Sequence, residues 1–202
     1  MTTKDPSIKQ LERFANRTNR NIHYSSKAYP SNAFAPVKHH HRQVYIPNNA
    51  DHTSILVCHY DPKQFGELEI YCGVFFPISS KEKIIIRQKD ILDKLNIFSG
   101  NNRAKTGYSV FDSKTMISKC SDSSRLKIFQ NQKIQEKILE AFSLDLRMKA
   151  GLNAMNLDFV NDLEGKNHLG LYITGQWLLE EDKLEQLFSI AETIRMQILM
   201  NN

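Results

Sequence analysis

The stretch of residues 53–76 constrains the fold more than any other part of the sequence. Residues 53–60, TSILVCHY, are β-branched or apolar on both faces, which is typical of a strand in the centre of a sheet. Residues 61–66 contain a proline and a glycine and predict a turn. Residues 67–76 then alternate, as expected for a half-buried antiparallel partner. The two runs therefore predict a hairpin within an antiparallel sheet.

Amphipathic helices are predicted at both ends of the chain. Asp5 and Pro6 suit the start of a first helix, which should end near Thr18. Residues 180–182 are acidic and precede a long apolar stripe, and a helix dipole favours negative charge at such a start. This C-terminal stripe should pack on the sheet and consists of Leu184, Leu187, Phe188, Ala191, Ile194 and Ile198. Hairpins and helices without a regular βαβ alternation indicate an α+β fold, a mainly antiparallel sheet with helices packed on one face and a long amphipathic C-terminal helix.

The remaining segments carry weaker patterns. Residues 83–87 predict a short strand, and residues 108–118 predict extended chain. Residues 157–160 and 169–173 predict two further strands. A helix should begin near Arg125, and its apolar stripe is formed by Ile134, Ile138, Phe142 and Leu146.

Positive charge is concentrated in the first quarter of the chain. Residues 1–50 contain eight lysines and arginines against two acidic residues, a net charge of +6. Residues 51–202 contain nineteen against twenty, a net charge of −1. We therefore divide the chain into a basic N-terminal helix and extended arm, residues 1–49, and a single α+β domain, residues 50–202.

The basic arm offers candidate contacts for an anionic partner. Its cations could attract the phosphates of a nucleic acid or of membrane headgroups, and the tyrosines between them could stack on bases or lie at a headgroup boundary. A protein partner is another alternative, and the arm could instead fold over its own domain with its charged groups in water. The candidate contact residues are Lys9, Arg13, Arg17, Arg20, Lys27, Lys38 and Arg42.

Three consecutive histidines, His39, His40 and His41, raise the question of a metal site. Successive residues of an extended chain point to opposite sides, so His39 and His41 could share a face while His40 could not. Two imidazoles do not complete a zinc site, and a third ligand would have to come from His23, His52, His59 or a carboxylate. Since no spacing identifies that ligand, we expect no metal site and no cofactor.

No common catalytic signature is present in the chain. Residues 103–107 lack the spacing of a phosphate-binding loop, and HExxH, CxxC, GxGxxG and GxSxG are all absent. The leading hypothesis is a non-enzymatic binding or accessory module. One alternative is an enzyme of unrecognised type with a pocket beside the sheet, using Asp112, His59 or Cys120. The other is a nucleic-acid-binding protein.

The cysteines and the hydropathy bear on location. The three cysteines are widely spaced, which argues against a disulfide framework. The N-terminal sequence lacks the apolar run of a secretory signal, and no stretch approaches the length of a membrane span. These features predict a cytoplasmic protein, or one at the periphery of a membrane.

Residues 107–112 read G-x-x-x-F-D, and Ser121-Asp122 follow before a helix and two strands. Over residues 85–200 this order resembles a loosely defined group of uncharacterised bacterial proteins with such a stretch, which often lies beside membrane helices. Met116-Ile117 stand where an aromatic residue is expected, and this chain has no membrane helices. The resemblance implies a fold pattern and no catalytic residues.

Overall fold

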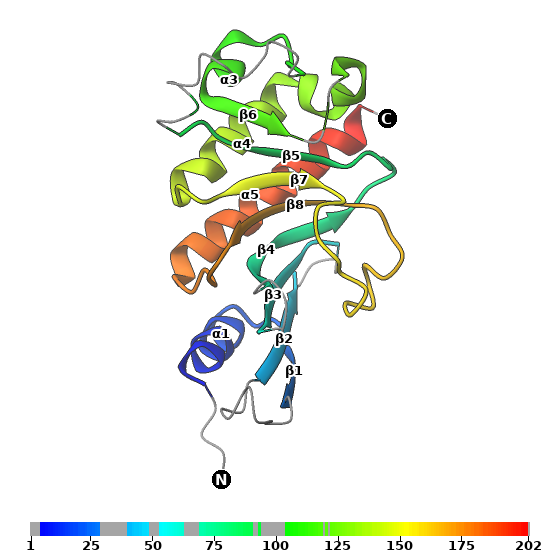
Figure 1. The fold of residues 1–202 in the computed structure, drawn as a ribbon. Helices are drawn as coiled ribbons and strands as arrows, with labels where there is room; N and C mark the ends of the chain where they lie inside the picture. Colours follow the sequence, from blue (N-terminus) through cyan, green and yellow to red (C-terminus); the bar gives the residue numbers. More distant parts are fainter. Residues whose placement is uncertain are drawn as a thin grey trace, which may run out of the picture.

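A single antiparallel sheet organises the molecule (Figure 1). The computed structural model describes residues 5–28, 40–48, 53–62, 69–90, 93, 104–118, 120 and 122–201. Eight strands pair in the order β1-β2-β3-β4-β8-β7-β5-β6, and every neighbouring pair is antiparallel. Their bounds are β1 His23–Ala28, β2 His40–Pro47, β3 Ile55–Asp61, β4 Glu69–Pro77, β5 Ile84–Gln88, β6 Thr115–Ser118, β7 Lys149–Leu152 and β8 His168–Thr174.

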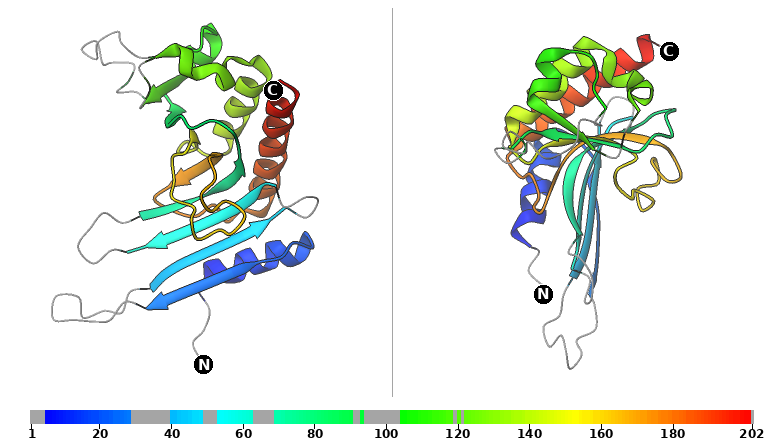
Figure 2. Two further views of the ribbon diagram at one scale, coloured as in Figure 1. Left: turned by 90° about the vertical axis from the view of Figure 1, so that its right-hand side faces the viewer. Right: turned by 45° about the horizontal axis from the view of Figure 1, so that its top comes forward.

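The main helices lie on one side of this sheet. Figure 2 shows α1, α4 and α5 together on that side, while the connection between β7 and β8 covers part of the other side. The α+β prediction, with a mainly antiparallel sheet and a long C-terminal helix, is therefore confirmed. The helices are α1 Pro6–Arg17, α3 Ser109–Lys114, the 3-10 helix η1 Ser123–Gln130, α4 Gln132–Leu144 and α5 Glu181–Met200.

The first helix begins as its sequence indicates. The Asp5 side chain accepts a hydrogen bond from the Ser7 amide at 2.9 Å, and Pro6 occupies the first turn, where its missing N–H is not needed. The buried face of α1 shares one core with the inward side chains of β2 and β3. Its buried residues are Ile8, Leu11, Phe14 and Ala15.

The predicted central hairpin is confirmed as β3 and β4. All but one residue of β3 is buried, and the strand is paired on both sides, by β2 and by β4. Cys58 lies directly opposite Cys72, and their Sγ atoms are 3.0 Å apart on the side of the helices. Strand β2 belongs to the predicted arm, yet it forms the same sheet as the rest of the chain through its pairing with β3.

Helix α5 buries the stripe that the sequence predicts. Leu184, Leu187, Phe188, Ala191 and Ile194 are all at most 2% exposed and share a core with side chains of β4 and β8. Acidic residues occupy the first turn of this helix, where its dipole favours them.

One predicted strand is wrong, and one segment predicted to be extended is extended only in part. Residues 157–160 form a turn within the connection between β7 and β8, where Leu157 and Val160 pack on the face of the sheet that points away from the helices. Their apolar character therefore reflects burial and not strand pairing. Residues 108–118 are only partly extended, because α3 precedes β6. Helix α3 is stabilised by Thr115, whose hydroxyl donates to the Phe111 carbonyl at 2.8 Å.

The helix predicted from Arg125 is divided. The 3-10 helix η1 covers its first part, and α4 begins only after Asn131, whose side chain caps the Ile134 amide at 3.2 Å. Helix α4 ends at Leu144, so Leu146 falls outside the helix and is exposed. The rest of the predicted stripe is buried.

On the face away from the helices, aromatic rings lie over glycines. A Cβ added at Gly170 would be 2.2 Å from the ring of Phe75, and one added at Gly151 would be 3.1 Å from the ring of Tyr172. The two rings are stacked, with centroids 5.9 Å apart. This face therefore has a second, smaller core, which the connection between β7 and β8 covers.

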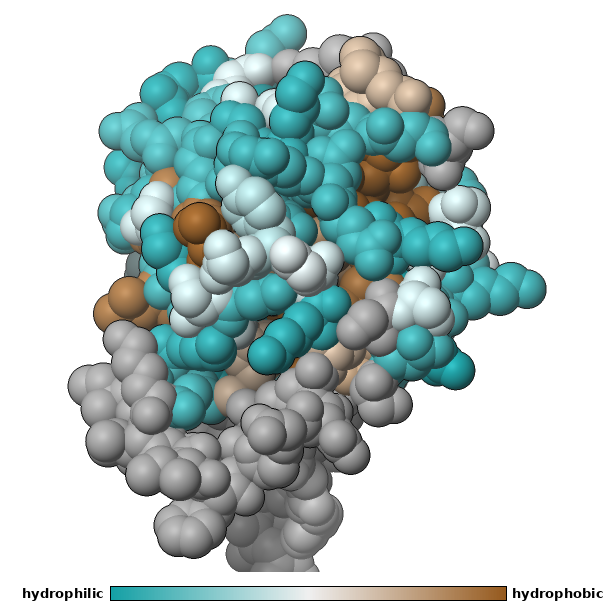
Figure 3. All heavy atoms as spheres, turned by 90° about the horizontal axis from the view of Figure 1, so that it is seen from above, coloured by the Kyte–Doolittle hydropathy of each residue, from teal (hydrophilic) through white to brown (hydrophobic). Residues whose placement is uncertain are grey.

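In the view from above (Figure 3), hydrophilic side chains cover most of the surface of the described residues, and a few small hydrophobic patches lie among them. Among the described residues, no helix is both long enough and apolar enough to cross a membrane.

Candidate metal centre

Two histidines and one aspartate gather at one end of β2 and β3. One potential ligand atom from each of His41, His59 and Asp61 lies within 4.8 Å of the others. His59 and Asp61 are two residues apart on β3 and therefore project to the same face. On β2, Gln43 pairs with His59, so His41, two residues away, reaches the same face next to Asp61. The pairing of two strands thus assembles a group that is dispersed in the sequence.

The His59 ring is held between two aromatic rings. Tyr71 stacks on it at 4.9 Å with an interplanar angle of 10°, and Phe159 lies 5.4 Å away. The His41 ring meets the His59 ring edge-on at 5.1 Å. The backbone carbonyl of His59 also accepts a hydrogen bond from the Trp177 indole at 2.9 Å. These contacts fix the position of His59 before any ligand binds.

Tyr71 is itself anchored. Burial, and second to it the negative charge of Glu69, raises the pKa of the Tyr71 phenol, which stays protonated. The hydroxyl donates to the carbonyl of Asn156 at 2.7 Å. Through this bond the connection between β7 and β8 is tied to the ring that supports His59.

The composition of the cluster fits a divalent transition-metal ion. Zinc and iron sites in proteins commonly use two imidazoles and one carboxylate, and they leave coordination positions for water or substrate. Bonds of about 2.0–2.2 Å would bring the three ligand atoms about 3–4 Å apart. Since these atoms already lie within 4.8 Å, small side-chain rotations are sufficient. His59 and Asp61 are 8% and 9% exposed, so bulk water competes little for them.

Charged neighbours flank the cluster on both sides. Lys27 pairs with His41 across β1 and β2, and Glu69 pairs with Asp61 across β3 and β4. Residues that are directly paired share a face, so one cation and one further carboxylate border the cluster.

The positions of His40 and His41 agree with the predicted alternation of side chains along an extended chain. His40 belongs to the opposite side of β2 from His41, and its Nδ1 lies 3.3 Å from the Ser26 hydroxyl. His39 lies outside the described residues. The sequence-based expectation of no metal site depended on the lack of an identifiable third ligand, and the structure places both His59 and Asp61 beside His41. Asp61 is not among the residues predicted for a site, although the H-x-D spacing of His59 and Asp61 in a strand puts both side chains on one face.

A hollow of about 440 Å³ adjoins the cluster on the same face of the sheet. His23 of β1 stacks on Tyr45 of β2 with centroids 4.4 Å apart, and Phe159 closes the opposite side. The hollow is lined by Ile22, His23, Tyr24, Ser25, Gln43, Tyr45 and Phe159.

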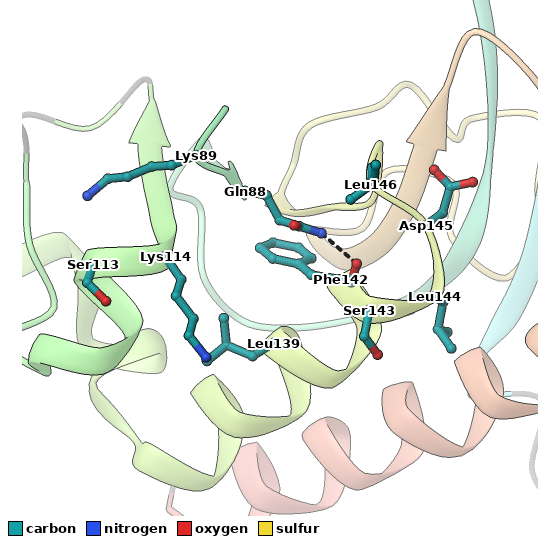
Figure 4. A pocket seen from close by; sticks show the side chains of 10 residues that line it. All are labelled: Gln88, Lys89, Ser113, Lys114, Leu139, Phe142, Ser143, Leu144, Asp145 and Leu146. Carbon is teal, nitrogen blue, oxygen red and sulfur yellow. Dashed lines mark hydrogen bonds between the residues drawn. The ribbon is translucent and has the colours of Figure 1, made fainter. Parts of the chain in front are cut away.

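A second hollow, of about 490 Å³, lies between the end of β5 and α4 (Figure 4). Its polar groups do not converge. Lys89 donates to the backbone carbonyl of Asp112 at 2.6 Å, Gln88 donates to the carbonyl of Phe142, and Asp145 is paired with Arg147 at 2.6 Å. Hydrogen bonds within the fold thus account for these side chains, and we assign no chemistry to this hollow.

Three of the predicted cation contacts bind acidic side chains of the same chain. Arg17 pairs with Glu181 at 2.6 Å, and Arg42 pairs with Asp5 at 2.8 Å. Arg20 forms a two-pronged ion pair with Glu185, whose second contact measures 3.2 Å. These three arginines hold α1 against α5 and β2.

Of the other predicted contacts, those that the structure describes lie on two different faces. Lys9 and Arg13 are exposed on the outward side of α1. Lys27 is exposed on β1, where its partner His41 belongs to the face of the sheet away from α1. Lys38 lies outside the described residues.

The candidate catalytic carboxylate Asp112 has a structural role. Its carboxylate accepts hydrogen bonds from the amide and hydroxyl of Thr106 and from the amide of Gly107, at 2.9–3.0 Å. It therefore closes the turn before α3. The candidate Cys120 is partly exposed, and its thiol donates to the carbonyl of Asp122 at 3.1 Å. Of the three candidates, His59 alone belongs to the cluster with His41 and Asp61.

Comparison with known proteins gives no relative from which a role could be taken. No family model matches the chain, and neither a curated protein nor a solved structure matches it.

Proposed function

We propose that this protein is a binding module that holds one divalent transition-metal ion, with zinc as the first candidate. The proposal rests on the cluster of His41, His59 and Asp61. In it, one ligand atom from each of two imidazoles and a carboxylate on paired strands lies within 4.8 Å of the others. The proposal keeps the sequence-based hypothesis of a binding module and gives it a ligand. It revises the expectation of no metal.

Two features of the surroundings support the proposal. Tyr71 and Phe159 hold the His59 ring in place, so less side-chain entropy is lost when it coordinates a metal. Glu69 adds negative charge beside Asp61, which favours a cation over a neutral occupant.

The test is metal binding by the full chain, purified without an affinity tag and without metal-affinity steps. The protein is stripped with a chelator, dialysed against zinc and analysed for bound metal, and its affinity is measured by competition with a chromophoric chelator. One equivalent of zinc is expected. His41→Ala, His59→Ala and Asp61→Ala should each weaken binding by at least about 10-fold, since each removes one of three ligands.

His40→Ala is the matched control. His40 belongs to the same histidine run but projects from the other side of β2, so its loss should leave the affinity unchanged. Circular dichroism of the metal-free variants checks that they fold. Absence of stoichiometric binding at micromolar zinc, or equal losses in His40→Ala and His41→Ala, would contradict the proposal and indicate simple surface capture.

Contact with an anionic partner is a second proposed role, and it is supported by the outward side of α1. Lys9 and Arg13 are one helical turn apart and exposed. We expect the double variant Lys9→Ala, Arg13→Ala to reduce any salt-sensitive retention on a generic oligonucleotide or on anionic vesicles. The matched control is Lys133→Ala, Lys137→Ala on α4, which removes the same charge from another helix. Equal retention of both double variants would refute a role for α1.

A cytoplasmic location is also proposed. The wide spacing of the three cysteines in the sequence supports this proposal, because a disulfide framework is typical of secreted proteins. Fractionation of cells that express the protein tests this assignment.

A further inference from the structure

We infer that the hollow beside the cluster binds a small planar aromatic carboxylate, which places its ring in the hollow and donates to the metal ion. The inference depends on the position of a cluster of three potential ligands next to a hollow of about 440 Å³ whose lining includes aromatic side chains. This inference rests on the proposed metal site.

The residues that line the hollow include direct neighbours of the cluster. Gln43 lines the hollow, pairs directly with His59 and is two residues from His41 on the same face of β2. Phe159 also lines the hollow and contacts the His59 ring at 5.4 Å. A molecule in the hollow would therefore have the metal ion within reach of a short donor group.

The charge of the metal site selects an anion. Two neutral imidazoles and one carboxylate leave a net charge of about +1 on a bound divalent ion. Lys27, which pairs with His41, adds a positive charge on the same face, and Glu69, which pairs with Asp61, adds a negative one, so the net charge around the bound ion stays at about +1. Coordination by three protein ligands leaves at least one position open, and a ligand carboxylate would both fill it and balance the charge.

The walls of the hollow select a flat ring. His23 and Tyr45 are stacked on each other with an interplanar angle of 13°, so a ligand ring could extend this stack on the outer face of one of them, and Phe159 is a further aromatic side chain of the lining. Aromatic rings pack favourably on such surfaces at centroid separations of about 4.5–7 Å. The volume lies in the lower part of the range for small-molecule sites, which limits the ligand to one or two rings.

Two isomers separate chelation from simple stacking. Pyridine-2-carboxylate can donate both its nitrogen and its carboxylate to one metal ion. Pyridine-4-carboxylate has the same charge and size but cannot chelate. Titration of each into the zinc-loaded full chain is followed by calorimetry, and protein-bound zinc is measured after gel filtration. We expect the 2-isomer to bind at least about 10-fold more tightly than the 4-isomer and to require zinc.

Variants test whether the hollow takes part. His23→Ala removes one wall without touching the cluster and should weaken binding of the 2-isomer by at least about 5-fold, with zinc affinity unchanged. Ser26→Ala, from the other side of β1, is the matched control and should have no effect. Equal binding of both isomers, an unaffected His23→Ala variant, or removal of zinc by the 2-isomer without a ternary complex would overturn the inference and leave the metal site intact. Failure to bind zinc in the first place would refute the proposed function itself.

Discussion

Phe188 connects the C-terminal helix to the N-terminal helix, and its removal tests whether α1 is an integral part of the fold. The side chain is 2% exposed, and its ring stacks on Phe14 of α1 with centroids 6.3 Å apart and an interplanar angle of 14°. The Arg20 guanidinium lies 4.4 Å from the Phe188 ring and 5.4 Å from the Phe14 ring. The three side chains form one cluster that joins the two helices.

The expected cost of Phe188→Ala follows from these contacts. Truncation of a buried phenylalanine costs about 3–5 kcal/mol through lost transfer energy and the cavity that remains. The contact with the Arg20 cation contributes about 0.5–2 kcal/mol of its own, which places this variant in the upper half of that range. For a chain of this length, a loss of about 4 kcal/mol corresponds to a fall of about 8–16 °C in the melting temperature.

Urea denaturation of the full chain, followed by circular dichroism, measures the change. Leu199→Ala is the control, because Leu199 belongs to the same helix but is 58% exposed and should change stability by less than about 0.5 kcal/mol. A double-mutant cycle with Phe14→Ala should give a coupling energy of about 0.5–1.5 kcal/mol. A cost below about 1 kcal/mol, or no coupling, would refute the docking of α1 on α5.

Two further predictions concern buried titratable groups. In the native protein a thiol reagent should modify Cys120 rapidly and leave the buried Cys58 and Cys72 unmodified until urea is added. Burial and, second to it, the hydrogen bond with Cys72 also raise the pKa of the Cys58 thiol, which lowers its reactivity further. Fast reaction of all three cysteines would contradict the structure. Burial lowers the pKa of His168 in the folded protein, so as the pH falls its imidazole is protonated first in the unfolded chain. The contribution of His168 to the free energy of unfolding should therefore be fully present above about pH 6.5, the ordinary pKa of histidine, and be lost as the pH falls through the lower pKa of the folded protein. Urea unfolding at pH 5.5 and 7.5 should show a smaller decrease for His168→Gln than for the unchanged protein, and an equal decrease would exclude His168 as the cause.

The parts of the fold that the sequence predicts are those where one physical pattern dominates. The hairpin of β3 and β4 has apolar residues at strand spacing, with a proline and a glycine in the sequence between them, and α5 has acidic residues at its start and a continuous buried stripe. In these segments the local preference and the tertiary burial agree, so a single sequence is sufficient.

The errors fall where apolar residues are buried without a regular element. Leu157 and Val160 have the composition of a strand, but they fill the second core from a turn, and periodicity cannot distinguish the two cases. Strand β7 was missed because only four residues, KAGL, form it, and two of them are small. At Gly151 the connection that follows β7 approaches closely, since an added Cβ would meet the Ala154 side chain at 2.7 Å.

The candidate metal centre depends on strand register, which no local pattern specifies. The alternation of β2 correctly separates His40 from His41, but it does not say which strand lies alongside. The register that brings His41 to Asp61 is fixed by residues on the opposite face, where Val44 pairs with Cys58 and Ile46 pairs with Leu56 beneath α1. A slip of one residue would turn these apolar side chains towards the wrong face, and burial under α1 therefore penalises it. The positions of the three ligands are thus determined by a core to which none of them belongs.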